Sequence, residues 1–119
     1  DVAKFLLEDN GIKVEEAENG QEAVDKFAVS KPGHYDAILM DIMMPGLNGW
    51  EATEKIRAMK RWDAERVSII ALSANSFADD IVSSKLAGMD MHLSKPLDEK
   101  KLLETIKQCL SKHMGEKKL

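Results

Sequence analysis

The chain has 119 residues, which is the length of one ordinary globular domain and enough to enclose a hydrophobic core. Hydrophobic residues make up 44% of it and charged residues 32%, so the composition is that of a folded domain, not a disordered one. The formal net charge of -4 argues against direct nucleic-acid binding, which requires a basic surface. The single cysteine, Cys109, excludes an internal disulfide, and the sequence contains no apolar run long enough to span a membrane. We therefore expect a cytoplasmic domain that makes no membrane contact of its own.

Short apolar runs alternate with amphipathic stretches along the whole chain. Apolar residues at helical spacing predict helices, and short runs rich in β-branched residues predict strands. In chain order the pattern predicts the end of a helix over 2–10, a strand over 12–17, a helix over 21–30, a strand over 35–40, a helix over 49–61, a strand over 67–72, a helix over 77–87, a strand over 91–94, a helix that begins after Asp98, and a frayed tail over 113–119. Strands that alternate with helices in this way predict βαβ units, a parallel sheet and the α/β class.

Three of the predicted strands end in polar residues that carry reactive or charged groups. Asp41 follows the run YDAILM, Ser73 follows VSIIAL and Lys95 follows MHLS. Sites in open parallel sheets form at the carboxyl ends of the strands, and neighbouring strands lie about 4.8 Å apart. Exposure to solvent would explain any one of these residues alone. The three together favour a binding site at one edge of the sheet.

A carboxylate, a hydroxyl and an ammonium group in one place suit phosphoryl transfer to the carboxylate. Asp41 would be the nucleophile and form an aspartyl phosphate. Lys95 and the Ser73 hydroxyl would each bind an oxygen of the phosphoryl group, whose charge lies on those oxygens. A divalent cation, Mg²⁺ or Mn²⁺, would bind a third oxygen. Asp41 supplies one carboxylate to such a metal, and a complete site needs further acids.

Four motifs in the chain resemble those of response-regulator receiver domains. The stretch DIMMPGLNG over 41–49 is similar to the family's motif around its phosphorylated aspartate. ALSAN over 71–75 resembles the switch-hydroxyl segment, LSKP over 93–96 the lysine-proline turn, and AENG over 17–20 the entry into the second helix. The resemblance covers essentially the whole chain. It implies a flavodoxin-like (βα)5 three-layer sandwich with a parallel sheet in the order 2-1-3-4-5.

The resemblance also assigns roles to individual positions. It makes Asp41 the phosphoacceptor and the backbone carbonyl of Met43 a metal ligand. It makes Ser73 the hydroxyl that moves to the phosphoryl group and Lys95 the partner of that group by ion pairing.

Further positions follow from the same comparison. Ala74 is small and leaves room for the phosphoryl group, while Met43 and Asn75 occupy places that tune the dephosphorylation rate. The peptide bond before Pro96 is expected to be cis. His92 occupies the place of the switch aromatic. It could act as a rotamer switch, as a pH-sensitive group or as a second phosphoryl donor, and the first interpretation is favoured.

Receiver domains open with a buried strand that ends in two or three acids, and the sequence contains no such strand. The acidic pair Glu8-Asp9, followed by Asn10, imitates that motif, but only Gly11 separates this stretch from the predicted strand over 12–17. A parallel crossover needs a helix at that point, so we interpret this pair as a solvated helix end. We expect residues 1–119 to be an N-terminally incomplete receiver domain whose remaining acidic metal ligands lie upstream. Direct pairing of the second and third expected strands would contradict this.

The favoured function is a phosphoacceptor module of a two-component phosphorelay. It would receive the phosphoryl group from a histidine kinase or a histidine phosphotransfer domain and switch the surface of the fourth helix, fifth strand and fifth helix. That surface could also form a homodimer. The segment over 71–96 is most similar to receivers of hybrid histidine kinases, including membrane-bound ones with a cytoplasmic receiver.

Two alternatives remain open. A pseudo-receiver would bind partners without accepting a phosphoryl group. A phosphohydrolase would also use Asp41 as nucleophile, but Met43 stands where such an enzyme usually has a second acid. A receiver catalyses its own phosphorylation and dephosphorylation without being a conventional turnover enzyme.

Overall fold

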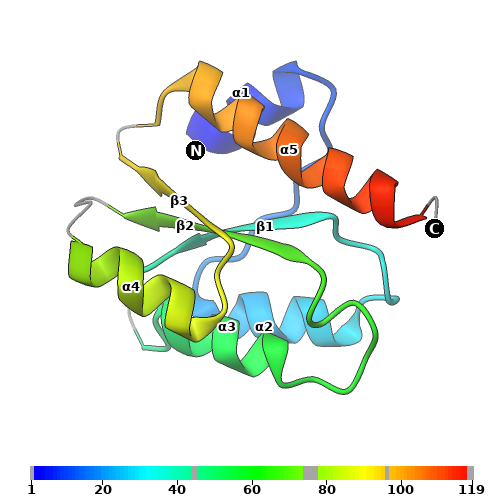
Figure 1. Cartoon of the computed structure of the whole chain (residues 1–119), viewed down its shortest axis with the longest axis vertical. Coiled ribbons are helices and arrows are strands. Elements are labelled where there is room, and N and C mark those ends of the chain that lie inside the picture. The colour runs from blue at the N-terminus through cyan, green and yellow to red at the C-terminus, as the bar shows by residue number, and fades with distance from the viewer. Residues whose placement is uncertain (1, 44–45, 74–77, 96, 118–119) are drawn as a thin grey trace.

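The computed structural model describes residues 2–43, 46–73, 78–95 and 97–117, and helices alternate with strands through most of these ranges (Figure 1). In chain order the elements are α1 (Val2–Asp9), α2 (Gly20–Val29), β1 (Ala37–Asp41), α3 (Gly49–Arg57), β2 (Ser68–Ser73), α4 (Ala78–Ala87), β3 (Met91–Ser94) and α5 (Glu99–Lys117).

The described strands form one sheet in the order β1-β2-β3, and both pairs are parallel. Their arrowheads point to the same side of the molecule in Figure 1. The register aligns Asp41 with Leu72, and Ser73 with Ser94. The carboxyl ends of all three strands therefore meet at one edge, as the sequence predicts.

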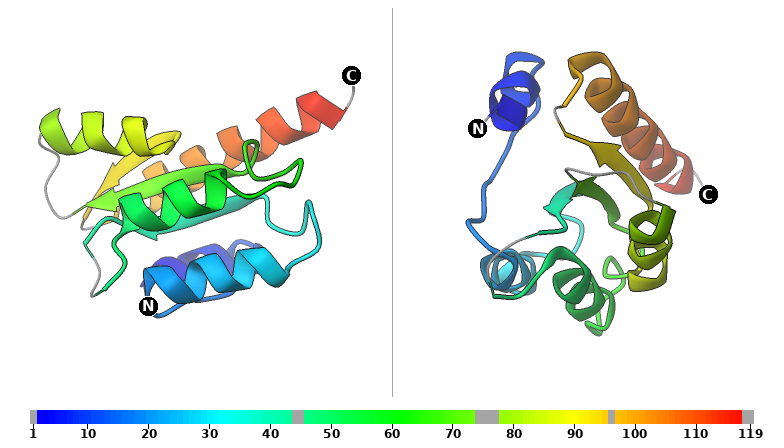
Figure 2. Two further views of the ribbon diagram at one scale, coloured as in Figure 1. Left: turned by 90° about the horizontal axis from the view of Figure 1, so that it is seen from below. Right: turned by 90° about the vertical axis from the view of Figure 1, so that its left-hand side faces the viewer.

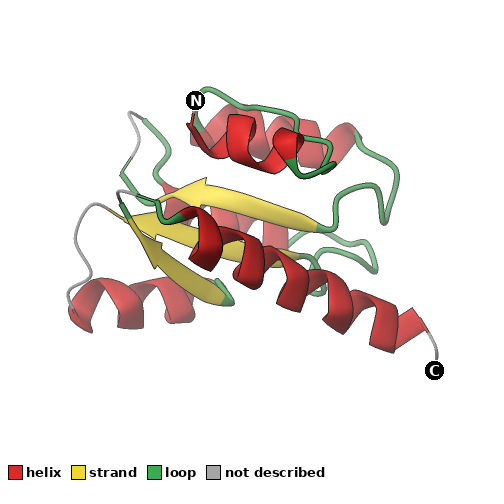
Figure 3. Ribbon diagram, turned by 90° about the horizontal axis from the view of Figure 1, so that it is seen from above, coloured by secondary structure: helices red, strands yellow, loops and turns green. Residues whose placement is uncertain are grey.

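Helices cover both faces of this sheet, which gives three layers. α1 and α5 lie on one face, and α2, α3 and α4 lie on the other (Figures 1 and 2). Figure 3 looks onto the first of these faces, where α5 crosses the strands. Each face has its own cluster of buried apolar side chains. On the α2/α3 face these include Phe27, Met40, Ala52, Ile56 and Ile69, and on the α1/α5 face Leu7, Ile70, Leu102, Ile106 and Cys109.

Side-chain caps fix where the two helices around β1 begin. Asn19 accepts a hydrogen bond from the backbone N–H of Glu22 at 2.8 Å before α2. Asn48 and Glu51 form a capping box before α3, in which each side chain accepts from the other residue's backbone N–H. Such caps satisfy N–H groups that the first helical turn leaves unpaired.

The strand expected over 12–17 is absent, and this prediction is wrong. The segment has no regular secondary structure, and β1 pairs with β2 alone among the described strands. A strand requires a neighbour for its backbone hydrogen bonds, and no described strand lies between this segment and β1. Ile12 and Val14 nevertheless pack against the α1/α5 cluster. The expected second and third strands therefore do not pair directly.

Other boundaries differ by a few residues. α3 ends at Arg57, not at 61, and the tail that was expected to fray is helical in α5 as far as Lys117. Glu8 and Asp9 are exposed at the end of α1, which confirms their interpretation as a solvated helix end. Within the described ranges no helix combines the length and the apolar character that crossing a bilayer requires.

Arg57 joins the amino ends of β2 and β3 from the end of α3. Its guanidinium donates to the carbonyls of Ala64 (3.1 Å), Val67 (2.7 Å) and Gly88 (2.9 Å) and forms an ion pair with Asp90 at 2.8 Å. Asp90 also accepts from the Ile69 backbone N–H. The side chain of Arg57 is largely buried, so these bonds replace the water that it gives up.

Arg61 and Asp63 form a second buried cluster at the same end of the sheet. The guanidinium of Arg61 donates to both carboxylate oxygens of Asp63, at 2.5 and 2.9 Å, and to the Phe27 carbonyl at 2.6 Å. Asp63, which is 3% exposed, also accepts from the Gly33 backbone N–H at 2.8 Å. The cluster ties the end of α2 to the loop that precedes β2.

Candidate functional site

Asp41 and Lys95 form an ion pair at the carboxyl edge of the sheet. Asp41 is the last residue of β1, and Lys95 follows β3 directly, so the Lys95 Nζ reaches across the end of β2 to the Asp41 Oδ1. Both side chains are partly exposed. The carboxylate is therefore accessible from solvent, with a cation beside it.

Ser73 occupies the strand end between these two residues. It is the last residue of β2 and is buried, and its carbonyl accepts a hydrogen bond from the Lys95 backbone N–H at 2.8 Å. The Ile42 N–H donates to the Leu72 carbonyl at 3.0 Å, which holds β1 to β2 at the same level. The structure thus brings together the three strand-end residues that the sequence singles out.

The first turn of α3 packs directly on the backbone of Asp41. The Gly49 N–H donates to the Ile42 carbonyl at 3.0 Å. A Cβ at position 49 would lie 2.2 Å from the Asp41 carbonyl oxygen, so the close approach requires glycine. The position of Asp41 is therefore fixed by α3 as well as by the sheet.

The donors at this edge fit part of a Mg²⁺ ligand set. Asp41 offers a carboxylate, and Met43, whose side chain is 82% exposed, lies two residues further along the chain and offers a backbone carbonyl. Mg²⁺ commonly takes one or two carboxylates and keeps several waters. Within the described ranges no group of three or more acids, histidines or cysteines could hold a metal by itself.

His92 lies on the α4 side of the sheet. Its neighbours Met91 and Leu93 pack into the α1/α5 cluster, and side chains alternate along a strand, so His92 points to the opposite face. Its Nε2 is buried and has no hydrogen-bond partner within the described part of the chain. The role of switch aromatic stays a prediction. The predictions for Ala74, Asn75 and Pro96 concern residues that lie outside the described ranges.

Contacts at two places in the fold have no clear signal in the sequence. The Trp50 Nε1 donates to the Ser84 Oγ at 2.9 Å and so joins α3 to α4. At the other end of β1, Glu15 accepts from the Tyr35 hydroxyl at 2.9 Å and lies 2.9 Å from the His34 Nε2. The hydrogen bonds from His34 and Tyr35 lower the pKa of Glu15. Burial, and then the hydrogen bond to Glu15, raises the pKa of Tyr35.

A parallel sheet with helices on both faces, and with an aspartate, a serine and a lysine at its carboxyl edge, defines a flavodoxin-like domain with a candidate anion-binding site. The family model of the response regulator receiver domain matches residues 1–107, and the chain belongs to this family. It is therefore a receiver domain of the two-component type, as its motifs predict.

Sequence similarity to several related proteins supports membership of the same family. Sensor protein GacS of Pseudomonas syringae pv. syringae is 42% identical over 109 residues, which are 88% of this chain and 11% of GacS. Hybrid signal transduction histidine kinase L of Dictyostelium discoideum is 38% identical over 104 residues, and the chain spans 6% of it. Protein PilH of Pseudomonas aeruginosa is 38% identical over 106 residues, and there the match covers 89% of this chain and 84% of PilH. The predicted similarity to receivers of hybrid histidine kinases is confirmed.

Solved structures agree with the fold. The receiver domain of a sensor histidine kinase from Pseudomonas aeruginosa PAO1 superposes with a TM-score of 0.82 at 34% identity, over 92% of this chain and 86% of that one. That structure contains a magnesium ion coordinated in its active-site cleft. A receiver domain protein from Methanospirillum hungatei JF-1 gives a TM-score of 0.84 at 28% identity, over 98% of this chain and 87% of that one.

Proposed function

We propose that Asp41 accepts a phosphoryl group from a histidine kinase or a histidine phosphotransfer domain, in the presence of Mg²⁺ or Mn²⁺. The observation that carries this proposal is the ion pair between Asp41 and Lys95 at the solvent-accessible edge of the sheet. A carboxylate placed beside a fixed ammonium group can receive a phosphoryl group whose negative oxygens the ammonium then binds.

The proposed reaction is a transfer between two nucleophiles. An Asp41 carboxylate oxygen attacks the phosphorus of a donor phosphohistidine, and the new P–O bond forms as the donor P–N bond breaks. The released imidazole nitrogen takes up a proton from water. Lys95 binds one phosphoryl oxygen, and the Ser73 hydroxyl donates to another. A partly exposed ion pair is worth only about 0–1 kcal/mol, so Lys95 can leave Asp41 at little cost when the phosphoryl group arrives.

The metal would be held by the Asp41 carboxylate and the Met43 carbonyl, with other donors completing the set. A bound Mg²⁺ neutralises charge on the transferred group. Because β1 pairs on one side alone among the described strands, its other edge offers unpaired backbone groups. We propose that a strand ending in acidic residues pairs with this edge in the natural polypeptide and supplies the missing carboxylates.

The output of the phosphorylated state would be a change in the surface of α4, β3 and α5. A kinase or phosphotransfer partner, or a second copy of the chain, would recognise that surface. The similarity to receivers of hybrid histidine kinases supports a place for this domain in the cytoplasmic part of such a kinase.

A phosphorylation assay with two matched variants tests the proposal. The natural polypeptide containing this chain is incubated with Mg²⁺ and a small phosphodonor, and the modification is located by peptide mass spectrometry. We expect one phosphoryl group on Asp41, none at this position in Asp41→Asn, and normal modification in Asp36→Asn, which changes an exposed aspartate at the other end of β1. Modification of the Asp41→Asn variant at the same level would contradict the proposal.

The same assay separates the alternatives. A phosphohydrolase would release phosphate over many turnovers per protein molecule. The exposed Met43 side chain offers no general acid or base for that reaction, which disfavours it. A pseudo-receiver would remain unmodified even with Mg²⁺ and excess donor.

A further inference from the structure

In the part of α4 whose side chains are described, residues 81–87, the fully buried side chains are small. Among the residues of α4 whose side chains are described, Ser84 and Ala87 are buried, while Val82 is 55% and Leu86 82% exposed. Val82 and Leu86 therefore contribute little to the packing of this helix, and Ile81 is only partly buried. Burial of so little apolar area provides weak attachment, so single polar contacts carry more weight than usual.

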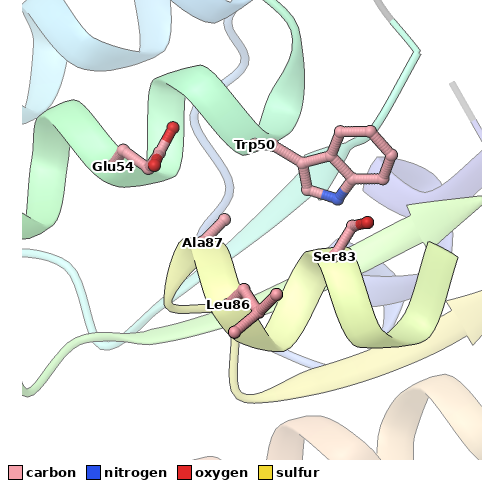
Figure 4. A pocket seen from close by; sticks show the side chains of 5 residues that line it. All are labelled: Trp50, Glu54, Ser83, Leu86 and Ala87. Carbon is pink, nitrogen blue, oxygen red and sulfur yellow. The ribbon is translucent and has the colours of Figure 1, made fainter. Parts of the chain in front are cut away.

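One such contact is the hydrogen bond from the Trp50 Nε1 to the Ser84 Oγ, at 2.9 Å. Ser84 is 2% exposed, so the hydroxyl is shielded from water, and loss of the bond would leave a buried polar group unpaired. The indole of Trp50 also lines an open groove of about 220 Å³ between α3 and α4. Figure 4 shows Trp50 and Glu54 on the α3 side of this groove and Ser83, Leu86 and Ala87 on the α4 side.

Trp50 is held in a fixed position relative to Asp41. It follows Gly49, whose Cα lies against the Asp41 carbonyl and whose N–H donates to the Ile42 carbonyl. The capping box of α3 further fixes this first turn. The hydrogen bond from the indole to Ser84 therefore depends on where α4 lies relative to Asp41.

The carboxyl end of α4 is held by an arginine of α3. At its carboxyl end, Arg57 donates to the Gly88 carbonyl and pairs with Asp90. At its amino end, four residues (74–77) connect Ser73 to Ala78. A displacement of Ser73 toward a phosphoryl group on Asp41 would thus be transmitted to the amino end of α4 while the carboxyl end stays in place. Such a rotation would separate Ser84 from Trp50.

We propose that Trp50 is a positioning residue whose hydrogen bond to Ser84 stabilises the α4 position found with unmodified Asp41, and thereby opposes phosphorylation. This inference rests on the proposed function. A bond present in only one of two states shifts the equilibrium toward that state by its own free energy. Its removal should therefore favour the phosphorylated state and tighten the binding of a phosphoryl analogue.

The test measures the affinity of the Mg²⁺-loaded natural polypeptide for beryllofluoride in wild type, Trp50→Phe, Ser84→Ala and the double variant. A net hydrogen bond corresponds to about a two- to tenfold change, so each single variant should bind about two- to tenfold more tightly, and the double variant no more tightly than either. Ser84→Thr keeps the hydroxyl and should retain wild-type affinity. Glu54→Gln, which changes the groove without touching the bond, is the matched control and should also bind as wild type does.

The outcomes are distinguishable. Variants that lose stability but keep wild-type affinity would give the bond a purely structural role and overturn the inference while leaving the proposed function intact. Additive effects in the double variant would also overturn it. Absence of beryllofluoride binding in the wild type would overturn the proposed function and this inference with it. A second readout is fluorescence in a Trp62→Phe background, where Trp50 is the only tryptophan within residues 1–119 and any other tryptophan of the natural polypeptide is likewise changed to Phe. Beryllofluoride should shift its emission, and an unchanged spectrum would contradict movement of α4 away from the indole.

Discussion

Lys95 and Asp41 pair across the end of a strand that belongs to neither of them, because β2 lies between β1 and β3. The ammonium therefore sits over the carboxyl end of the central strand, where Ser73 ends it. We expect a phosphoryl group on Asp41 to contact the Lys95 ammonium directly and to draw the Ser73 hydroxyl toward it.

The first prediction concerns Lys95. Lys95→Met should slow Asp41 phosphorylation by about 10²-fold, because a positioned group that stabilises developing charge is lost. The unfolding free energy should change by no more than about 1 kcal/mol, since the pair is partly exposed. Rates follow from time-resolved mass spectrometry and stability from urea unfolding. Lys100→Met, an exposed lysine in the first turn of α5, is the control. A wild-type phosphorylation rate in Lys95→Met would show that Lys95 takes no part in the transfer.

The second prediction concerns Arg57, which bonds to three carbonyls and one carboxylate. Arg57→Met should lower the free energy of unfolding by about 3 kcal/mol, because it leaves these acceptors without their partner. Lys55→Met, an exposed lysine on the same helix, should change it by less than about 0.5 kcal/mol. Equal unfolding midpoints in urea for the two variants would show that the Arg57 bonds add nothing to stability.

The third prediction concerns the pH dependence of stability. Burial raises the pKa of the Asp63 carboxyl, but the hydrogen bonds from Arg61 and the Gly33 N–H outweigh burial, and the net pKa lies below its ordinary value. A lowered folded-state pKa adds stability that is fully present above the unfolded-state pKa of about 3.9 and is lost as the pH falls through the folded-state value.

The free energy of unfolding of wild type should therefore exceed that of Asp63→Asn by a constant amount from pH 7 to about pH 5, and the difference should shrink below about pH 4. Urea unfolding at a series of pH values measures this. Asp36→Asn, an exposed control, should show no such trend. A difference between wild type and Asp63→Asn that persists unchanged in acid would mean that the Asp63 charge does not contribute.

The fourth prediction concerns the contact between Gly49 and Asp41. In Gly49→Ala the new Cβ would meet the Asp41 carbonyl oxygen at 2.2 Å, so α3 must shift. We expect a loss of about 1–3 kcal/mol in unfolding free energy and slower phosphorylation, since Asp41 moves with the helix. Lys55→Ala, on the exposed side of α3, should leave both unchanged. A Gly49→Ala variant with wild-type stability and rate would show that the helix start adapts without strain.

The strands of the sheet and the polar groups at its edge could be predicted because short stretches of consecutive residues carry the signal for each. A nearly continuous apolar run marks β1 and a run rich in β-branched residues marks β2. Polar residues end these strands and follow β3, so the sequence predicts Asp41, Ser73 and Lys95 at one edge. The segment over 12–17 has a strand-like pattern, but a strand exists only in a pair, and the pattern carries no information about its neighbour.

The side-chain bonds that join distant elements could not be predicted. The partners of Arg57 are mostly backbone carbonyls, which every residue possesses, so no residue pattern marks them. The bond between Trp50 and Ser84 depends on how close α3 and α4 lie, which follows from the packing of both helices on the sheet. His34 has no sequence signal for a partner, yet it meets Glu15 because the fold brings their segments together.

The two arginine clusters occupy the amino ends of the strands, while the groups proposed for chemistry occupy the carboxyl ends. Adaptation of this domain to heat or acid can therefore proceed around Arg61 and Asp63 without altering the geometry around Asp41. Thermostabilising substitutions often compromise enzymes whose strained reactive groups also hold the molecule together. Here the residues that stabilise the fold and the residues proposed for phosphorylation lie at opposite ends of the sheet. Stability and the rate of phosphorylation can therefore evolve separately.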